Sequence, residues 1–465
     1  MTTLDDSLDR VGAWLRDSLP ALLAEHDVPA AQVAVGRRGE VVDAAAGVLS
    51  TATGVAATPD AVFQIGSITK VWTATLVLQL ADEGRLDLDD PVRRHLPEFR
   101  LADESAAAAV TVRQLLSHTA GFEGDIFLDT GRGDDCLELF VAALADVPQL
   151  FAPGTQFSYN NAGYCVLGRL VEVLRGTTYD ACLREHLIAP LGLTHAATDA
   201  YEAILFRAAV GHVRPAPGQD QVPAPVWALM RSNGPAGSML AMRARDLLGF
   251  ARMHLAGGRA DDGTQVLSPA SAAAMRERQV ELPDLRVMGD AWGLGWELFD
   301  SLGTPVHGHD GNTIGQASFL RVLPEHDLAV VLLTNGGDPY GLYRDVVGSV
   351  LRELAGVELR PLPSPPADPP RVDAGRFTGT YGSRVADLVI TADEDGRIWV
   401  EMRPKDLVAE LGETPERSEL VGFAADTLIP VQAQQGLHVP YAFLGDDGAG
   451  HPRWLHIGRA VPRVG

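Results

Sequence analysis

Lysine is nearly absent from this chain of 465 residues. Lys70 and Lys405 are the only two among 38 lysines and arginines, so arginine supplies almost all of the positive charge. Arginine effectively never releases its proton, whereas a desolvated lysine can. A lysine that is kept in such a chain therefore indicates a role that arginine cannot fill.

Cysteine is scarce, and long apolar runs are missing. Cys136, Cys165 and Cys182 are odd in number and irregularly spaced, which favours reduced core thiols over a disulfide framework. No stretch reaches the roughly 18 apolar residues of a membrane span. Residues 1–30 lack the positive charge of an export signal, and their apolar residues recur at helical spacing. The sequence therefore predicts an amphipathic N-terminal helix and residence in the cytoplasm.

Positive charge is also in short supply overall, because the formal net charge is −23. This balance argues against nucleic acid and anionic membranes as partners. A hydrophobic content of 46% with 48 glycines and 30 prolines is typical of a soluble globular protein rich in turns. A chain of this length is too long for one ordinary core, so we expect two domains.

A proline-rich segment divides the chain into an α/β part and an all-β part. Residues 361–370 hold six prolines, which indicates an extended linker. We therefore predict a catalytic domain at 1–358, a linker at 359–371 and a small β sandwich or barrel at 372–465. Within the first domain, strand pairs at 30–49 and 317–335 and a helix at 341–356 flank a helical middle, so one sheet is expected to draw strands from both ends.

The first candidate motif is Gly66-Ser67-Ile68-Thr69-Lys70, followed by the apolar run VWTATLVLQL. If a helix begins at Ser67, the hydroxyl and the ammonium lie on one face. Burial would lower the pKa of Lys70 and make it a proton acceptor for Ser67. The alternative is an ordinary serine N-cap beside a lysine that reaches solvent.

The second candidate motif is Tyr159-Asn160-Asn161, between a Pro-Gly turn and an apolar helix. A phenol can exchange a proton with Ser67 and Lys70, and an amide can bind a substrate carbonyl. The overlapping Ser158-Tyr159-Asn160 leaves the register open, and an asparagine-rich turn is the structural alternative.

The third candidate motif is His309-Asp310-Gly311, before a predicted strand. Glycine here is expected to let the substrate backbone approach a strand edge. The backbone N–H groups of Ser67 and Asn312 could then form an oxyanion hole. His307 and His309 also suggest a metal site, but no cysteine or acidic cluster at ligand spacing accompanies them, and we expect no metal.

Together these motifs resemble the serine β-lactamase and penicillin-binding-protein superfamily, on its class C and D-alanyl-D-alanine-carboxypeptidase branch. The resemblance extends over roughly residues 10–355 and includes FQIGSITK, TVRQLLSHTAGF, FAPGTQFSYNNAGYCVLG, AWGLGW and GHDG, in family order. It implies that Ser67 is the acyl-forming nucleophile and that Lys70 and Tyr159 are its general-base pair. It also selects Asn161 as the substrate-binding asparagine, implies a β-lactamase-like α/β fold and requires no cofactor.

Asp310 departs from the exported members, since it would repel a substrate carboxylate and suit an ammonium. The chain is most similar to the stand-alone penicillin-binding-protein-type thioesterases, which have a C-terminal lipocalin-like β domain. That resemblance implies a peptidyl thioester with a C-terminal D-residue, carried by a peptidyl carrier protein and released by head-to-tail macrolactamisation. Asp310 would receive the amine and Arg459 would act in the site. The alternatives are a serine hydrolase, an amide synthase joining two small molecules, and an inactive binding protein.

Overall fold

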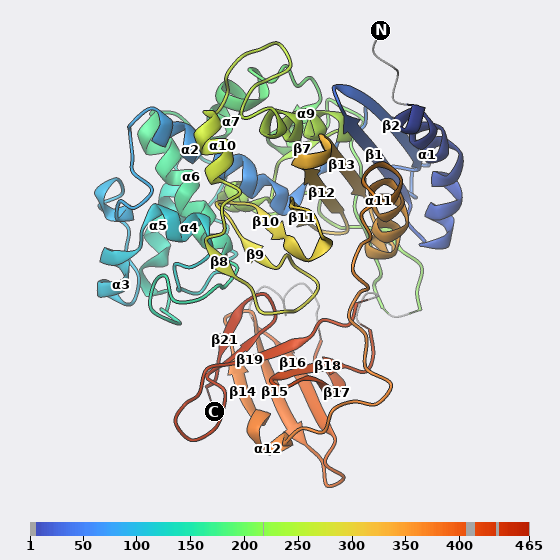
Figure 1. Ribbon diagram of the computed structural model, residues 1–465. Helices are drawn as coiled ribbons and strands as arrows, with labels where there is room; N and C mark the ends of the chain where they lie inside the picture. The colour runs from blue at the N-terminus through green and yellow to red at the C-terminus, as the bar shows by residue number, and fades with distance from the viewer. Residues whose placement is uncertain (1–5, 217, 406–413, 434–436, 465) are drawn as a thin grey trace.

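The computed structural model describes residues 6–216, 218–405, 414–433 and 437–464. Eight antiparallel strands form its first sheet, namely β1 (Ala30–Arg37), β2 (Glu40–Gly47), β8 (Val280–Glu281), β9 (Ala291–Trp292), β10 (Glu297–Phe299), β11 (Val306–Asn312), β12 (Ala317–Leu323) and β13 (Leu328–Thr334). Their order is β2-β1-β13-β12-β11-β10-β9-β8 (Figure 1). The sheet thus joins both ends of the domain, as the sequence predicts.

The two expected strand pairs are confirmed, and local turn chemistry explains the first. Arg37 pairs with Glu40, which leaves a two-residue turn in which Arg38 and Gly39 both have positive φ. This geometry suits the right-handed twist of the adjoining strands. The second pair, β12 and β13, is fully buried along its length, which explains why its sequence is apolar except at Ser318, Arg321 and Thr334.

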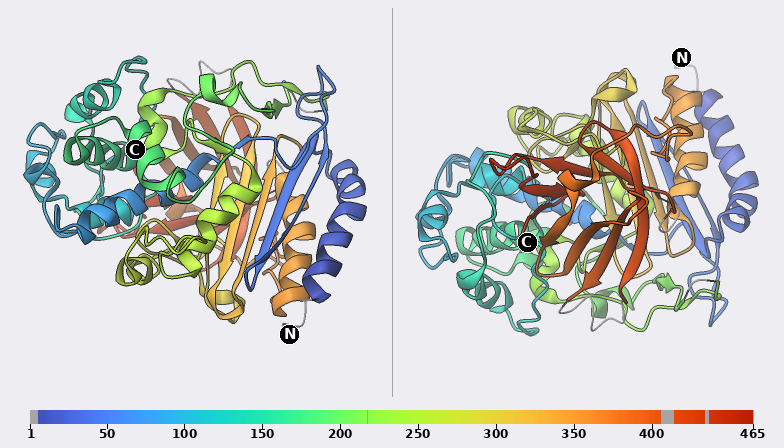
Figure 2. Two further views of the ribbon diagram at one scale, coloured as in Figure 1. Left: turned by 90° about the horizontal axis from the view of Figure 1, so that it is seen from above. Right: turned by 90° about the horizontal axis from the view of Figure 1, so that it is seen from below.

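Helices cover both faces of this sheet. The helices α1 (Asp6–Glu25) and α11 (Pro339–Ala355) lie together on one face, and α9 (Ala244–Leu255) lies on the other (Figure 2). The N-terminal amphipathic helix is confirmed, because α1 buries one stripe made of Leu8, Val11, Leu15, Leu19 and Leu23. No helix among the described residues is long and apolar enough to cross a membrane.

The helical part of the domain is built on α2 (Thr69–Asp82), whose residues 69–80 are all buried and which packs against α6 (Asn161–Arg175), α7 (Tyr179–Leu183) and α10 (Pro269–Ala274). A helix that is apolar on all sides is typical of a protein core, and α2 accordingly lies at the centre of the helical part of the domain. The others are α3 (Glu104–Ala109), α4 (Val112–Leu116), α5 (Cys136–Ala142) and α8 (Ala200–Ala203). All three cysteines are buried and unpaired, as expected.

The structure differs from the sequence prediction in two places. Ser67 lies in a 3₁₀ turn, η1 (Gly66–Ile68), and the helix begins only at Thr69. The middle of the domain is also less purely helical than expected. It contains the short strands β3 (Phe63–Gln64), β4 (Ala196–Ala197), β5 (His212–Val213), β6 (Val222–Pro223) and β7 (Ala241–Met242), and the main sheet takes β8 to β10 from the segment that follows.

The C-terminal part is all-β apart from one helical turn, α12 (Ala374–Phe377), and this confirms the predicted class. Its eight-stranded antiparallel sheet runs in chain order through β14 (Gly379–Gly382), β15 (Ala386–Ala392), β16 (Ile398–Pro404), β17 (Glu416–Ala424), β18 (Thr427–Pro430), β19 (Tyr441–Leu444), β20 (Trp454–His456) and β21 (Ala460–Pro462). A bridge between Tyr381 and Arg463 joins the two edge strands, so the sheet curls toward a barrel. Residues 359–371 contain no helix or strand.

The C-terminal sheet lies across the middle of the first domain, as the view from below shows (Figure 2). The turn between β20 and β21 makes the closest connection. His456 Nε2 donates to the Phe157 carbonyl at 3.0 Å, and the Tyr159 N–H donates to the Gly458 carbonyl at 3.0 Å. The second domain therefore holds the segment that carries Tyr159.

Candidate active site

Ser67 and Lys70 lie side by side at the start of α2. Lys70 Nζ donates to Ser67 Oγ at 3.0 Å and to the Ala236 carbonyl at 2.6 Å. The side chain of Lys70 is fully buried, so the alternative of a lysine reaching solvent does not describe this structure. Ser67 makes no side-chain cap for α2, which excludes the simple N-cap alternative as well.

The environment of Lys70 favours its neutral form. Burial, assisted by the positive charge of Arg459, lowers the pKa of Lys70 to about 7. A buried cation loses its hydration, and the carboxyl groups of Asp125 and Glu297 offset this only in part. Near neutral pH, a large fraction of Lys70 can therefore accept the Ser67 proton.

Tyr159 completes the group around the nucleophile. Lys70 Nζ lies 4.7 Å from the centroid of the Tyr159 ring. Burial raises the pKa of the Tyr159 phenol well above its usual value, although a hydrogen bond with Ser67 opposes the shift. The phenol thus stays protonated near neutral pH, and it can relay or donate a proton while Lys70 acts as the acceptor.

Asn161 and Arg459 meet at one carboxylate that the sequence analysis did not select. Asn161 Nδ2 donates to Asp125 Oδ1 at 2.7 Å, and Arg459 Nε donates to Asp125 Oδ2 at 2.9 Å. The Arg459 guanidinium carbon also lies 4.8 Å from the centroid of the Tyr159 ring. Arg459 belongs to the C-terminal domain, so that domain contributes a cation to the site.

The His-Asp-Gly motif lies on β11, within the strand rather than before it. The Asp310 carboxylate is held by Arg321, whose Nη1 and Nη2 donate to its two oxygens at 2.5 and 3.1 Å. Arg321 is buried on β12, so the negative charge expected beside the nucleophile is largely paired. Asp310 still lines the cavity described below.

Gly311 has a different reason for being glycine than the one expected. A Cβ at this position would lie 2.0 Å from the Ile65 carbonyl oxygen, so the protein's own chain fills that space rather than substrate. The neighbouring residue shows the same packing, because a Cβ on Gly66 would lie 2.6 Å from the Asn312 nitrogen. These contacts hold the nucleophile turn against β11, with Gly66 beside Asn312, and the oxyanion hole formed by the N–H groups of Ser67 and Asn312 stays a prediction.

The site opens into a cavity of about 520 Å³. This volume falls within the range of about 300–1,000 Å³ that is usual for small-ligand sites. Both domains form its walls, and the lining residues include Ser67, Tyr159, Asn161, Glu297, His309, Asp310, Asn312 and Tyr340 from the first domain, with Leu437, Val439, Ile457 and Arg459 from the second. The structure therefore brings every expected site residue except Lys70 and Gly311 into the lining of one cavity, and Lys70 is hydrogen-bonded to the lining residue Ser67.

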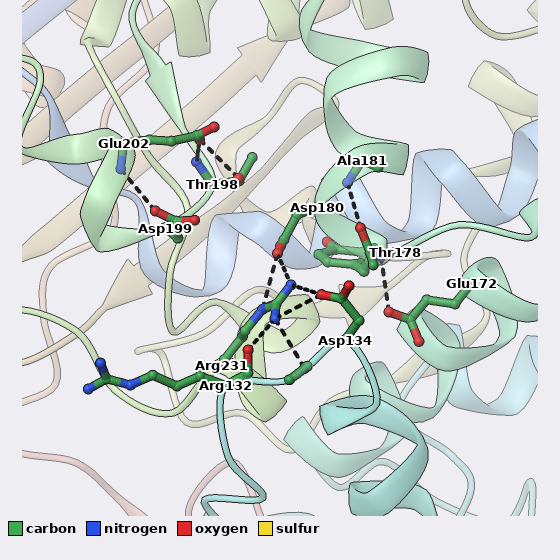
Figure 3. Close-up of polar contacts among 12 residues, drawn as sticks. Arg132, Asp134, Glu172, Thr178, Asp180, Ala181, Thr198, Asp199, Glu202 and Arg231 are labelled. Atoms are coloured by element: carbon green, nitrogen blue, oxygen red, sulfur yellow. Dashed lines mark hydrogen bonds and ion pairs between the residues drawn. The ribbon is translucent and has the colours of Figure 1, made fainter.

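A charged cluster fixes the segment that supplies the Ala236 carbonyl. This segment is the 3₁₀ helix η5 (Arg231–Ala236), and Figure 3 shows its first residue between Asp180 of α7 and the loop that carries Arg132 and Asp134. Arg231 donates to Asp180 Oδ2 at 2.9 Å, to the Arg132 carbonyl at 2.6 Å and to Asp134 Oδ1 at 3.3 Å. The cluster thus anchors one end of η5, and the other end binds Lys70.

Sequence reasoning missed Asp125, Glu297 and Arg321. Arg321 and Glu297 had a usable signal, since each is a charged residue within an otherwise apolar strand. Because helices cover both faces of the sheet, a charged side chain in such a strand is buried and needs a hydrogen-bonding or charged partner. Asp125 had no such signal, because it lies in an irregular loop.

Comparisons with known proteins agree with this geometry. The family model described as Beta-lactamase matches residues 15–348. Penicillin-binding protein 4 of Amycolatopsis lactamdurans is 49% identical over 371 residues, which are 79% of this chain and 97% of that protein.

Solved structures extend the likeness to the C-terminal domain. SurE has a TM-score of 0.78 and 32% identity, over 99% of this chain and 100% of SurE. The octameric penicillin-binding protein homologue from Pyrococcus abyssi has a TM-score of 0.64 over 94% of this chain and 96% of its own, and at 21% identity it supports the fold alone. From its site, its fold and these matches, this chain belongs to the serine β-lactamase and penicillin-binding-protein family of enzymes.

Proposed function

We propose that this protein is a trans-acting peptide cyclase. It takes a peptidyl thioester with a D-residue at its C-terminus onto Ser67 and releases the peptide by head-to-tail macrolactamisation. The observation that carries the proposal is the shared cavity, in which Arg459 and the apolar side chains of Val439 and Ile457 from the second domain face the nucleophile.

Acylation follows from the contacts of Ser67. As Ser67 Oγ attacks the thioester carbonyl, its proton passes to neutral Lys70, 3.0 Å away, and then to the departing thiolate. The backbone N–H groups of Ser67 and Asn312 would stabilise the negative oxygen of the tetrahedral intermediate. Peptidyl carrier protein is the proposed donor, and since such thioesters form inside cells, the proposal includes action in the cytoplasm.

Release by an amine rather than water is supported by the walls of the cavity. Apolar side chains from both domains lower the local water content, while an amine tethered to the acyl group has a high effective concentration. The likeness to SurE at 32% identity spans both domains, and a second SurE structure includes D-Leu. A D-residue next to the reacting carbonyl is proposed here on that basis.

A second candidate function is acylation of Ser67 by a β-lactam, followed by slow or rapid hydrolysis. The observation in its favour is the 49% identity to Penicillin-binding protein 4. The Ser67–Lys70 arrangement would serve this reaction equally well, because only the acyl donor differs.

The test uses a short peptidyl thioester that ends in a D-residue, with products followed by mass spectrometry. A product lighter than the linear acid by one water, absent with Ser67→Ala, is expected. The same thioester ending in the L-residue is the matched control and should react more slowly. Linear acid alone from both substrates, together with stable labelling of Ser67 by a fluorescent penicillin, would instead establish the second candidate.

A further inference from the structure

Glu297 is a cavity residue that the acylation step does not use. It lies at the start of β10 with 4% of its surface exposed, and it lines the same cavity as Ser67. Its Oε2 atom is buried and has no hydrogen-bond partner. An unpartnered carboxyl oxygen in a protein interior is unfavourable, and such an oxygen at the wall of a substrate cavity indicates a ligand that donates hydrogen bonds.

His309 presents a second unsatisfied acceptor beside it. Its Nδ1 lies 3.7 Å from Glu297 Oε1 and donates to the Asp310 carbonyl at 2.6 Å. The neutral ring therefore carries its lone pair on Nε2, which is buried and also has no partner. The ionised carboxylate of Glu297 and the Nε2 atom of neutral His309 both accept hydrogen bonds and cannot donate them, so together they define a place for an N–H donor.

Asp310 is less available for the same role. Arg321 binds both of its carboxylate oxygens, and the guanidinium of Arg321 is itself fixed over the Phe299 ring, at 4.4 Å from the centroid. An ammonium at Asp310 would have to compete with a cation that is already in place.

We propose that Glu297, together with His309 Nε2, binds the amine that attacks the Ser67 ester and accepts the proton that converts its ammonium form into the nucleophile. This assignment rests on the proposed cyclase function and names the acceptor subsite of that reaction.

The electrostatics of Glu297 agree with this role. Burial and the negative charge of Asp310 raise the pKa of the Glu297 carboxyl to about 8. An α-amine has a pKa of about 7.7 to 8.0, so the two groups share a proton nearly equally, whereas an ordinary carboxylate would keep the amine as an unreactive ammonium. The groups facing Glu297 are His309 and Asp310 on β11, Arg321 on β12, Lys70 on α2, Tyr159, and Tyr340 and Tyr343 on α11.

The proton and bond changes balance. One proton passes from the bound ammonium to the Glu297 carboxylate, and the free amine attacks the ester carbonyl. The C–N bond forms and the C–Oγ bond to Ser67 breaks. The second amine proton passes to neutral Lys70 and from there to Ser67 Oγ, while Glu297 returns its proton to solvent.

The test compares wild type with Glu297→Gln, which keeps the shape and removes the proton acceptor. The readout is the ratio of cyclic peptide to linear acid from the D-terminated thioester, measured from pH 6.5 to 9.5. We expect a ratio about 100-fold lower at pH 7, the size of effect typical for one positioned proton acceptor. The deficit should shrink above pH 9, where solvent deprotonates the amine.

Two controls separate this role from a structural one. An N-acetylated thioester cannot cyclise, so the acyl mass that it leaves on Ser67 reports acylation alone in each variant. Glu297→Asp retains a carboxyl and should recover part of the ratio. A pH-independent deficit, or equal loss of acylation and cyclisation, would overturn the role of Glu297. Linear acid alone from wild type would instead refute the cyclase function itself.

Discussion

The guanidinium carbon of Arg459 lies 4.8 Å from the centroid of the Tyr159 ring, and its Nε is bonded to Asp125. Arg459 is far along the chain from Asp125 and Tyr159, and it meets them because the β20–β21 turn pairs with the segment 157–159. The C-terminal domain thus supplies a cation to the cavity wall, and after burial the charge of Arg459 is the next cause that lowers the pKa of Lys70.

Removal of that cation should shift the pH dependence of acylation. Burial and then Arg459 lower the pKa of Lys70, so Arg459→Met should raise that pKa and move the rising limb of the acylation rate to higher pH. The rate constant is measured by intact-protein mass spectrometry across pH 5.5 to 9.5. Arg463→Met, which removes a cation just after β21 that contacts Tyr381 instead, is the control. An unshifted profile in Arg459→Met would contradict the electrostatic coupling.

The ionisation of Lys70 itself should determine the pH at which the acylation rate rises. Its neutral form is the proton acceptor, so the acylation rate should rise with pH through about 7 and then level off. Lys70→Arg keeps the charge and cannot lose its proton, and it should acylate about 1,000-fold more slowly at every pH. A variant that acylates at near wild-type rate would assign the base to another residue.

The anchoring of η5 should depend on one of two acidic residues. The Asp180 side chain is 14% exposed and lies 2.9 Å from Arg231, whereas the Asp134 side chain is 80% exposed and lies 3.3 Å away. Asp180→Asn should therefore lower the free energy of unfolding by about 2 kcal/mol and slow acylation, and Asp134→Asn should change it by less than about 0.5 kcal/mol. Urea unfolding of both variants provides the comparison, and equal effects would contradict it.

Glycine at 311 should be required for packing rather than for substrate entry. Gly311→Ala would place its Cβ 2.0 Å from the Ile65 carbonyl, so we expect a loss of stability of about 2 kcal/mol or more, with displacement of the Ser67 turn. Gly234→Ala meets no atom within 4 Å and is the matched control. If Gly311→Ala kept its melting temperature and lost only substrate affinity, glycine at 311 would instead serve the approach of the substrate backbone.

Most of the architecture could be predicted from the sequence, because it follows local patterns. The helical period of its apolar residues predicts α1. The tight turn at Arg38-Gly39 predicts the hairpin of β1 and β2, and two largely apolar runs predict β12 and β13. Ser67 and Lys70 could be paired for the same reason, since three residues of separation near a helix start bring them together in either an α or a 3₁₀ turn.

The rest of the site depends on tertiary contacts that no local pattern encodes. Asp125 joins Asn161 to Arg459 across the domain interface, and Arg321 reaches Asp310 only because β11 and β12 pair in one register. Because Arg321 pairs with Asp310, the carboxylate is less available to bind a substrate ammonium. This pairing could not be inferred from the His-Asp-Gly triplet. Residues that are adjacent in a sequence motif therefore need not act together, because tertiary contacts decide which side chains meet in the site.

The most direct measurement of the central claim is a rapid-quench experiment on wild type with the D-terminated thioester, sampled by intact-protein and product mass spectrometry. The account predicts an acyl mass on Ser67 that appears first and decays at the rate at which cyclic peptide forms. An acyl mass that decays only to linear acid, or cyclic peptide that forms equally fast with Ser67→Ala, would contradict it.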